Sequence, residues 1–455
     1  MAISGTDSKT PRPPAFPHGS EPPSLVPMYR QLLPISALLL GSALLLFAGG
    51  INSLILPVRG SEEGFSTAAL GFLGTGWAIG YVLGCLFIPR LVASVGHIRT
   101  FGVMCAVASI AILSQALVVE AWAWIPVRAI SGFSFAGSAM IVESWLNDRA
   151  EPTTRGRIFG IYSMVNLAAS TAGQMVIALG DTSGFLFFAL GAIFYSLALI
   201  PTAISTSQTP APLTTVRLDL RALWQNSPVA VMAVFLVGIS NSAFGTLSAV
   251  YADRVGLDLS SIALFASLPV LAGAIAQIPF GILSDRMDRR KVLVLTCLLA
   301  LAADVTFAVL QPTDQMLNLV LASVFGAAIF AMYPIIVAHA NDHAPPGTSI
   351  QVSGGLLMVY GIGAIAGPLI AGWVMGPLGP RGLFLTTIAG HLVMIAFTLW
   401  RISRRAAVAE ADKGDFHASL PARIATPETV VLQEGDGAAA PLSPEDHAET
   451  PPDAP

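Results

Sequence analysis

Long apolar stretches alternate with short polar segments along most of the chain, and the polar segments carry most of the charged residues. Most apolar stretches are close to the ~20 residues that an α-helix needs to cross the hydrocarbon core of a bilayer. The pattern predicts an all-α polytopic membrane protein with twelve transmembrane helices, because backbone polar groups in lipid must be satisfied within helices or closed barrels. The predicted spans are residues 35–57, 67–88, 100–118, 123–146, 158–180, 185–205, 228–250, 260–283, 292–310, 316–340, 350–375 and 383–402.

A polar segment in the middle of the chain divides the spans six plus six. We expect an N-terminal six-helix bundle at residues 32–206, a linker at 207–227 and a C-terminal six-helix bundle at 228–405. Residues 1–31 are polar and proline-rich, and residues 406–455 are acidic with no helical apolar period. Segments of such composition bury too little apolar surface to fold, so both are predicted to be disordered tails.

The composition supports a membrane protein and narrows the function classes. Hydrophobic residues make up 54% of the chain and charged residues 11%, whereas soluble domains contain about 25% charged residues. No cluster of catalytic side chains, metal-ligand spacing or phosphate-binding Gly-x-x-x-x-Gly-Lys-Ser/Thr loop occurs in the sequence. We therefore expect no enzyme activity, no metal, no cofactor, no nucleotide motor and no nucleic-acid partner.

The basic residues predict the orientation in the membrane, because cytoplasmic loops are enriched in Lys and Arg. With the N-terminus inside, only Arg59, Arg254 and Arg381 fall in outside loops, and Arg128 falls in a span. The remaining nineteen of the 23 Lys and Arg residues lie in inside segments. Both termini and the linker are therefore predicted to be cytoplasmic.

The two halves repeat each other at polar and glycine positions. A parallel repeat of six helices predicts a pseudo-two-fold axis along the membrane normal. Matching positions include Asn52-Ser53 with Asn241-Ser242, Gly96 with Asp288, Asn147-Asp148 with Asn341-Asp342, and Gly160 with Gly354.

Three motifs carry a resemblance to a known family. Residues 281–291 (GILSDRMDRRK), 128–136 (RAISGFSFA) and 366–372 (AGPLIAG) resemble loop and helix motifs of the major facilitator superfamily, and the likeness covers about residues 30–405. The equivalent N-terminal loop at 89–99 (PRLVASVGHIR) is degenerate. Together with residues 143–148 (ESWLND) and 155–157 (RGR), this loop resembles a poorly characterised bacterial branch of that superfamily.

The resemblance implies a secondary active transporter of a small molecule, working by alternating access in the bacterial inner membrane. It also implies a monomer in the lipid bilayer and a transport cycle coupled to protons. Two alternatives stay open: an uncoupled facilitator, and a membrane sensor that binds a ligand without moving it.

Arg128 is an unusual residue for a membrane span. A charge within the hydrocarbon costs about 2.5 kcal/mol or more, so its helix should face protein or water. Its side chain could snorkel to the outer interface. Alternatively, it faces a cavity, where it helps to move protons or holds an anionic group of the substrate.

Five further side chains within spans are candidates for substrate binding or coupling. Buried amides need hydrogen-bond partners, which a substrate or a neighbouring helix could provide. The resemblance implies that spans 1, 4, 7 and 10 line the cavity, which favours the first three of these candidates. They are Asn52, Asn241, Tyr333, Asn166 and Gln174.

Glu143 lies about 22 Å from Arg128 along the same helix, at 1.5 Å per residue. The resemblance implies that an acid here belongs to the charge relay of the loop motif. We therefore expect Glu143 to pair with Arg90 or Arg99 and to latch the inner ends of the N-terminal half. A proton-carrying role is the alternative, and Asp304 in the ninth span is a rival for it.

The loop between spans 8 and 9 is the second candidate for gating. The enrichment of basic residues on the inside explains the arginines of this loop, but it does not explain Asp285. We expect Asp285, Arg286 and Arg290 to form a conformational latch at the inner face.

Overall fold

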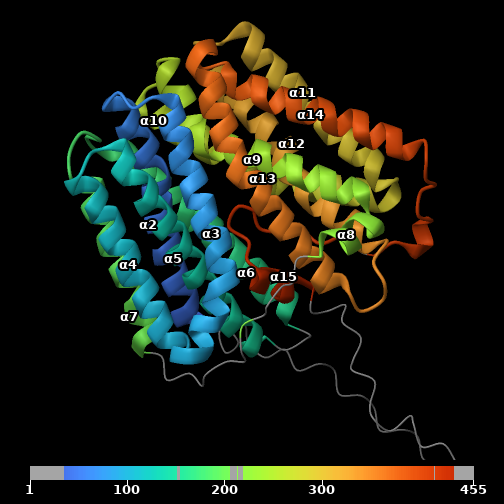
Figure 1. The fold of residues 1–455 in the computed structure, drawn as a ribbon, viewed down its shortest axis with the longest axis horizontal. Coiled ribbons are helices and arrows are strands. Elements are labelled where there is room, and N and C mark those ends of the chain that lie inside the picture. Colours follow the sequence, from blue (N-terminus) through green and yellow to red (C-terminus); the bar gives the residue numbers. More distant parts are fainter. Residues whose placement is uncertain (1–34, 151–153, 205–212, 214–218, 415, 435–455) are drawn as a thin grey trace, which may run out of the picture.

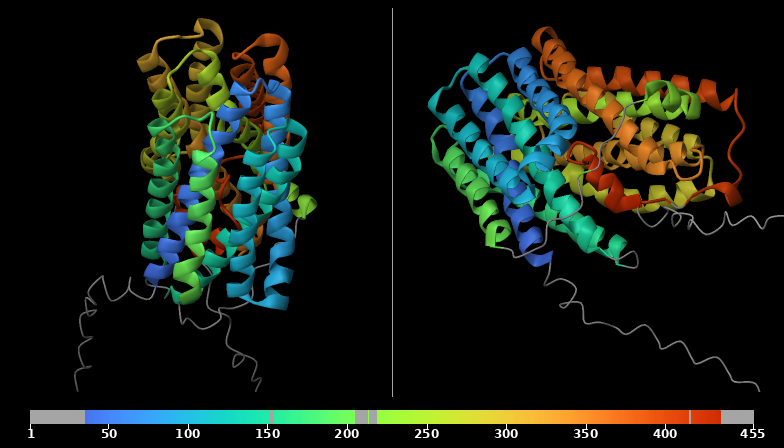
Figure 2. Two further views of the ribbon diagram at one scale, coloured as in Figure 1. Left: turned by 90° about the vertical axis from the view of Figure 1, so that its left-hand side faces the viewer. Right: turned by 60° about the horizontal axis from the view of Figure 1, so that its bottom comes forward.

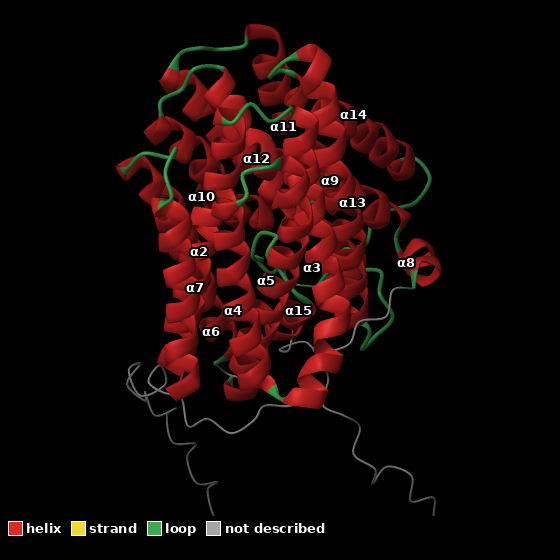
Figure 3. Ribbon diagram, turned by 60° about the vertical axis from the view of Figure 1, so that its left-hand side comes forward, coloured by secondary structure: helices red, strands yellow, loops and turns green. Residues whose placement is uncertain are grey.

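The computed structural model describes residues 35–150, 154–204, 213, 219–414 and 416–434. These residues form helices and connecting segments, and no strand occurs among them (Figures 1 and 3). Eleven of these helices are long and apolar enough to cross a membrane. Helix α6, with 21 residues, takes the fifth of the twelve predicted positions, but it falls outside this set. The predicted all-α polytopic fold is confirmed.

The N-terminal half contains the first six of these long helices. Helix α3 lies against α5 so closely that a Cβ added at Gly80 would collide with the backbone of Ala129. Gly132 makes an equally close approach to Trp77, so small residues let the two helix backbones meet. The helices are α2 (Ser36–Glu62), α3 (Thr67–Val95), α4 (His97–Leu117), α5 (Ala121–Arg149), α6 (Arg155–Met175) with the 3₁₀ turn η2 (Val176–Leu179), and α7 (Leu186–Ile204).

The C-terminal half repeats this arrangement with six helices. Part of the predicted linker forms a further short helix, α8 (Leu220–Asn226), whose N-terminus is capped by the Asp219 carboxylate. Ser227 caps the next helix, which begins with Pro228, a residue suited to a first helical turn. The six helices are α9 (Pro228–Arg254), α10 (Leu259–Arg286), α11 (Arg289–Leu310), α12 (Gln315–Asn341), α13 (Ser349–Leu378) and α14 (Gly382–Ile402).

The two halves meet tightly at one end of the molecule, which we call the closed end. It carries the loops at residues 63–66 and 255–258. A Cβ added at Gly71 of α3 would collide with the carbonyl oxygen of Pro368 on α13. The Ser61 hydroxyl also donates to Asp253 Oδ2 over 2.5 Å, which joins the ends of α2 and α9. Backbone-to-backbone packing of this kind leaves no passage between α3 and α13.

The opposite end, which we call the tail end, corrects the prediction of a disordered C-terminal tail. Residues 416–434, here named the tail segment, enter between the two halves and end in α15 (Pro427–Glu434) (Figure 2). A 3₁₀ turn, η3 (Glu410–Asp412), precedes the segment. The prediction rested on the average composition of residues 406–455, which is acidic. Within them, this stretch contains the apolar residues Leu420, Val430 and Leu432, and all three are buried. The predicted N-terminal tail and residues 435–455 lie outside the described residues.

Candidate functional site

A cavity of about 130 Å³ lies between the two halves, and we call it the central cavity. Four of the predicted site residues line it, each from a different helix. Asn52 and Asn241, which the internal repeat matched, come from α2 and α9, the first helix of each half. Arg128 comes from α5 and Gln174 from α6. The repeat therefore places equivalent amides at one site.

Arg128 faces the central cavity and does not reach the surface. Only 6% of the residue is exposed, and its Nε has no hydrogen-bond partner among the described residues. The Oδ1 atoms of Asn52 and Asn241 are buried in the same way without a partner there. A buried polar group without a partner costs about 1–3 kcal/mol. These atoms are therefore suited to receive a polar ligand.

Apart from Arg423 of the tail segment, the rest of the lining of the central cavity is apolar or weakly polar. Trp77, Phe135 and Phe244 supply aromatic walls. No aspartate or glutamate occurs among the described residues that line the cavity, so Arg128 has no acidic counterpart there. The Gln174 amide donates to the Ser53 hydroxyl over 3.4 Å and stays at the wall.

Two predicted site residues lie away from the central cavity. Asn166 is buried within the N-terminal half, where its Oδ1 accepts a hydrogen bond of 2.7 Å from Ser42. The two roles predicted for Asn166 were a contact to substrate and a hydrogen bond to a neighbouring helix. The bond to Ser42 joins α6 to α2 and is the second of these. Tyr333 lines a separate pocket at the tail end, beside Asp342 and Thr429.

Glu143 does not make the predicted pair with Arg90 or Arg99. The carboxylate is fully buried, with Oε1 accepting from the Tyr162 hydroxyl over 2.9 Å and Oε2 accepting from the Thr426 hydroxyl. Both arginines are exposed. The prediction was wrong because it paired charges along the membrane face, whereas Glu143 points into the interior, toward α6 and the tail segment.

The charge cluster of the C-terminal half centres on Arg289, which was not among the predicted gating residues. Arg289 Nε lies 2.6 Å from Asp342 Oδ2, and Nη1 lies 3.0 Å from Asp285 Oδ1. Arg286, which we expected in this latch, is exposed. Arg290 binds Asp288 at 2.8 Å. The loop motif therefore ties α10 and α11 to the end of α12.

A third group of ionisable side chains lies deep in the C-terminal half, between α11 and α14. Asp304 and His391 are fully buried and 2.7 Å apart. The Thr387 hydroxyl donates to Asp304 Oδ1 over 2.6 Å, and the Ser240 hydroxyl lies 3.3 Å from His391 Nε2. Ser240 precedes Asn241 in α9, so this network reaches the wall of the central cavity.

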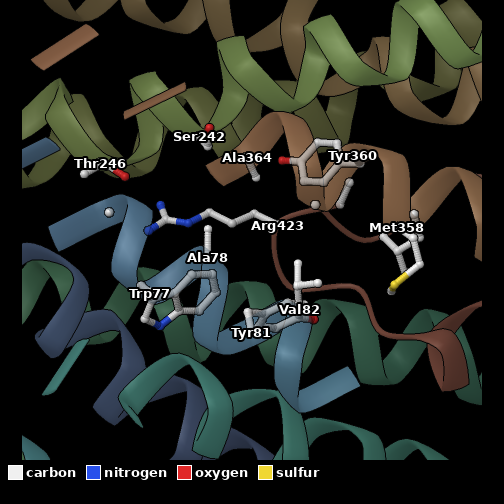
Figure 4. A pocket seen from close by; sticks show the side chains of 14 residues that line it. Trp77, Ala78, Tyr81, Val82, Ser242, Thr246, Met358, Tyr360, Ala364 and Arg423 are labelled. Atoms are coloured by element: carbon white, nitrogen blue, oxygen red, sulfur yellow. The ribbon is translucent and has the colours of Figure 1, made fainter. Parts of the chain in front are cut away.

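The sequence contained a signal for only some of the missed residues. The repeat matched Asp342 with Asp148, and Arg289 lies within the loop motif, so both could have been selected. Arg423 had no such signal, yet it lines the central cavity and also the adjoining pocket that Figure 4 shows. No group of three or more His, Cys, Asp or Glu side chains that could hold a metal occurs in the part of the chain that the structure describes.

Comparisons with known proteins agree on one family. A sequence model described as Major Facilitator Superfamily matches residues 38–354 and 230–433. An uncharacterized MFS-type transporter of Yersinia pestis is 26% identical over 385 residues, which is 81% of this chain and 95% of that protein. The uncharacterized MFS-type transporter YcaD of Salmonella arizonae is 26% identical over 372 residues, 80% of this chain and 95% of that protein.

Solved transporter structures share the fold. The nucleoside transporter NupG superposes with a TM-score of 0.71 at 15% identity, covering 82% of this chain and all of that one. A bacterial homolog of the human lysosomal transporter Spinster, in an inward-facing and occupied conformation, gives a TM-score of 0.66 at 17% identity. That match covers 87% of this chain and 99% of the other.

Proposed function

The chain belongs to the major facilitator superfamily, and we propose that it is a secondary active transporter that moves a small molecule through the central cavity by alternating access. Its bacterial relatives and its many membrane helices support a location in the bacterial inner membrane. The observation that carries the proposal is Arg128, buried at the junction of the two halves with an unused donor.

The lining of the central cavity favours a substrate with an acidic group. A guanidinium in a dry site binds carboxylate or phosphate oxygens strongly, often through two parallel hydrogen bonds. The free amide oxygens of Asn52 and Asn241 would accept hydrogen bonds from hydroxyl or amine groups of the same molecule. We therefore infer a small organic acid or zwitterion, with the aromatic walls covering its apolar part.

The structure corresponds to the inward-facing form if the tail end is cytoplasmic. The exposed basic residues at that end support this orientation under the positive-inside rule. Transport would then require the closed end to separate at the α3–α13 contact while the tail end closes. The cluster around Arg289 would keep the tail ends of α10, α11 and α12 together during this movement.

Proton coupling would need a side chain that can release its proton. Arg128 stays protonated in proteins, so it cannot carry the proton itself. Glu143 and the Asp304–His391 pair are buried acids within the helices and are the candidates. An imposed pH gradient that never drives transport in proteoliposomes would leave the uncoupled facilitator as the function.

The test begins with a thermal-stability screen of purified protein against small organic acids and zwitterions. A ligand that stabilises the wild type should fail to stabilise Arg128→Ala, and Arg128→Lys should retain part of the effect. In proteoliposomes, Arg128→Ala should abolish uptake of that ligand. Arg381→Ala is the control, because Arg381 is exposed and its Nε donates only to the carbonyl oxygen of Leu378 at the end of α13.

Normal uptake by Arg128→Ala against a gradient would exclude the proposed role of Arg128. If no acid or zwitterion stabilises the wild type, the proposed substrate class is wrong.

A further inference from the structure

The tail segment places an arginine inside the central cavity. Arg423 Nη1 donates to the carbonyl oxygen of Gly245 over 2.7 Å. Its guanidinium also lies over the Trp77 ring, 5.3 Å from the ring centroid (Figure 4). Trp77 belongs to the N-terminal half and Gly245 to the C-terminal half, so one side chain contacts both walls of the cavity.

The residues after Arg423 bind the N-terminal half. The Tyr81 hydroxyl donates to the carbonyl oxygen of Ala425 over 2.7 Å. The Thr426 hydroxyl donates to the buried carboxylate of Glu143. The Asn147 amide donates to the carbonyl oxygen of Glu428 over 3.2 Å. These bonds fix α15 against α5.

The residues before Arg423 bind the C-terminal half. The buried amide of Gln277 makes two hydrogen bonds with the backbone of Ser419: Oε1 accepts from the N–H over 2.8 Å, and Nε2 donates to the carbonyl over 3.1 Å. The Phe416 ring covers Gly281 of α10 so closely that a Cβ there would collide with it. The tail segment is therefore anchored to both halves and crosses the space between them.

From this placement we propose that the tail segment is a tethered plug, which fills the tail-end half of the transport pathway and must withdraw before substrate reaches Arg128. The proposal rests on the proposed function, because it takes the central cavity as that pathway. A segment bonded to both halves also opposes their relative movement. When it is docked, the tail segment stabilises the inward-facing form and blocks the pathway to the central cavity.

The bonding of the plug favours reversible docking. Arg423 has no carboxylate partner within 4.0 Å among the described residues, and it shares the cavity with the positive charge of Arg128. A guanidinium taken from water without an ion partner loses much of its hydration energy. The connection at residues 403–409 is mostly exposed and not helical, so it can serve as a tether. The segment also buries Leu420, Val430 and Leu432, so its docking is stabilised by apolar contacts as well as by hydrogen bonds that water can replace.

The experiment measures access to the cavity without any substrate. A cysteine at Thr246, beside Arg423, is labelled with a membrane-impermeant thiol reagent in inside-out vesicles. The native Cys85, Cys105 and Cys297 are buried and are replaced to lower the background. A protease site inserted between Ala406 and Ala407 of the full chain lets the tail be released after folding.

Labelling of the intact protein should be slow, and it should rise about tenfold or more after cleavage, because several hydrogen bonds are lost together. The double variant Arg423→Ala/Thr426→Ala should show the same rise without cleavage. His417→Ala is the matched control, because His417 is exposed in the same segment and only its carbonyl oxygen is bonded. Fast labelling of the intact protein, unchanged by cleavage, would overturn the plug.

A transport measurement separates this proposal from the proposed function. Once a substrate is known, cleavage should raise its uptake rate by about the same factor as the labelling. Faster labelling with unchanged or slower uptake would show a segment that stabilises the protein rather than inhibits it, and would overturn the plug. Absence of transport in both forms, together with faster labelling, would reject the proposed function and leave the docking of the segment supported.

Discussion

The two halves have the same arrangement of helices, but they differ in whether their buried charged side chains form ion pairs. In the N-terminal half, neither Arg128 nor Glu143 has an ion-pair partner among the described residues. In the C-terminal half, buried Arg289 lies 2.6 Å from Asp342. The repeat places His97 opposite Arg289, and neither ring nitrogen of His97 has a hydrogen-bond partner in the described chain.

This difference suggests a division of work between the halves. A buried charge is tolerated when it is paired and hydrogen-bonded, so the paired charges of the C-terminal half stabilise a fixed frame. A single buried charge keeps its capacity to bind an ion or exchange a proton. In the N-terminal half the unpaired Arg128 lines the central cavity, whereas in the C-terminal half the paired Arg289 ties the ends of three helices together.

The largest effect that would test this comparison is expected at Asp342. Asp342→Ala leaves the buried Arg289 with Asp285 as its remaining acidic partner, so the protein should be destabilised by about 3 kcal/mol, the lower end of the range for a broken buried pair. The equivalent change in the N-terminal half is Asp148→Ala, at an exposed position, where a change of no more than about 0.5 kcal/mol is expected. Thermal unfolding in detergent measures both. Equal losses for the two variants would contradict the proposed frame.

A smaller effect is expected at the Asp304–His391 pair. Thr387→Val removes the donor to Asp304 Oδ1 and should cost about 1–3 kcal/mol, because a buried carboxylate oxygen loses its partner. The neighbouring Thr386→Val is the matched control, since that hydroxyl donates to Gly382 of its own helix. If both variants melt at the same temperature, the hydrogen bond from Thr387 to Asp304 does not stabilise the C-terminal half.

The helices were predictable from sequence because apolar length is a local property. Asn52 and Asn241 could also be placed together, since their positions follow from the repeat and from where the first helix of each half lies. Glu143 was assigned the wrong partners, because the identity of a partner depends on which way one side chain points within a bundle.

The tail segment could not be predicted by the same reasoning. Its few apolar residues have no helical period, and they are surrounded by acidic, proline-rich sequence. They become buried only because the two halves leave a space between them at the tail end. Arg423 binds a carbonyl oxygen of α9 and a ring of α3, two contacts that exist only after both bundles have folded.

The smallest predicted effect concerns pH and the loop before α11. Burial alone would raise the pKa of Asp288, but the hydrogen bonds and charge of Arg290 outweigh it and hold that pKa below its ordinary value. A lowered folded-state pKa adds stability above the unfolded value of about 3.9, and this stability is lost as the pH falls through the folded value. Asp288→Asn should therefore cost about 1 kcal/mol or less at pH 7, and this cost should become smaller as the pH falls below the unfolded value.

The position that the repeat matches with Asp288 provides a control from the N-terminal half. Gly96 stands opposite Asp288, at a φ of 90° that other residues rarely adopt. Gly96→Ala should therefore lower the melting temperature through backbone strain, and by a similar amount at pH 7 and pH 3, because no titratable group is changed. Melting curves of both variants and the wild type at the two pH values provide the test. If the difference in melting temperature between Asp288→Asn and wild type is as large at pH 3 as at pH 7, the charge of the Asp288 carboxylate does not stabilise the loop. The stabilising ion pairs of this loop would then be only those of Arg289 with Asp285 and Asp342.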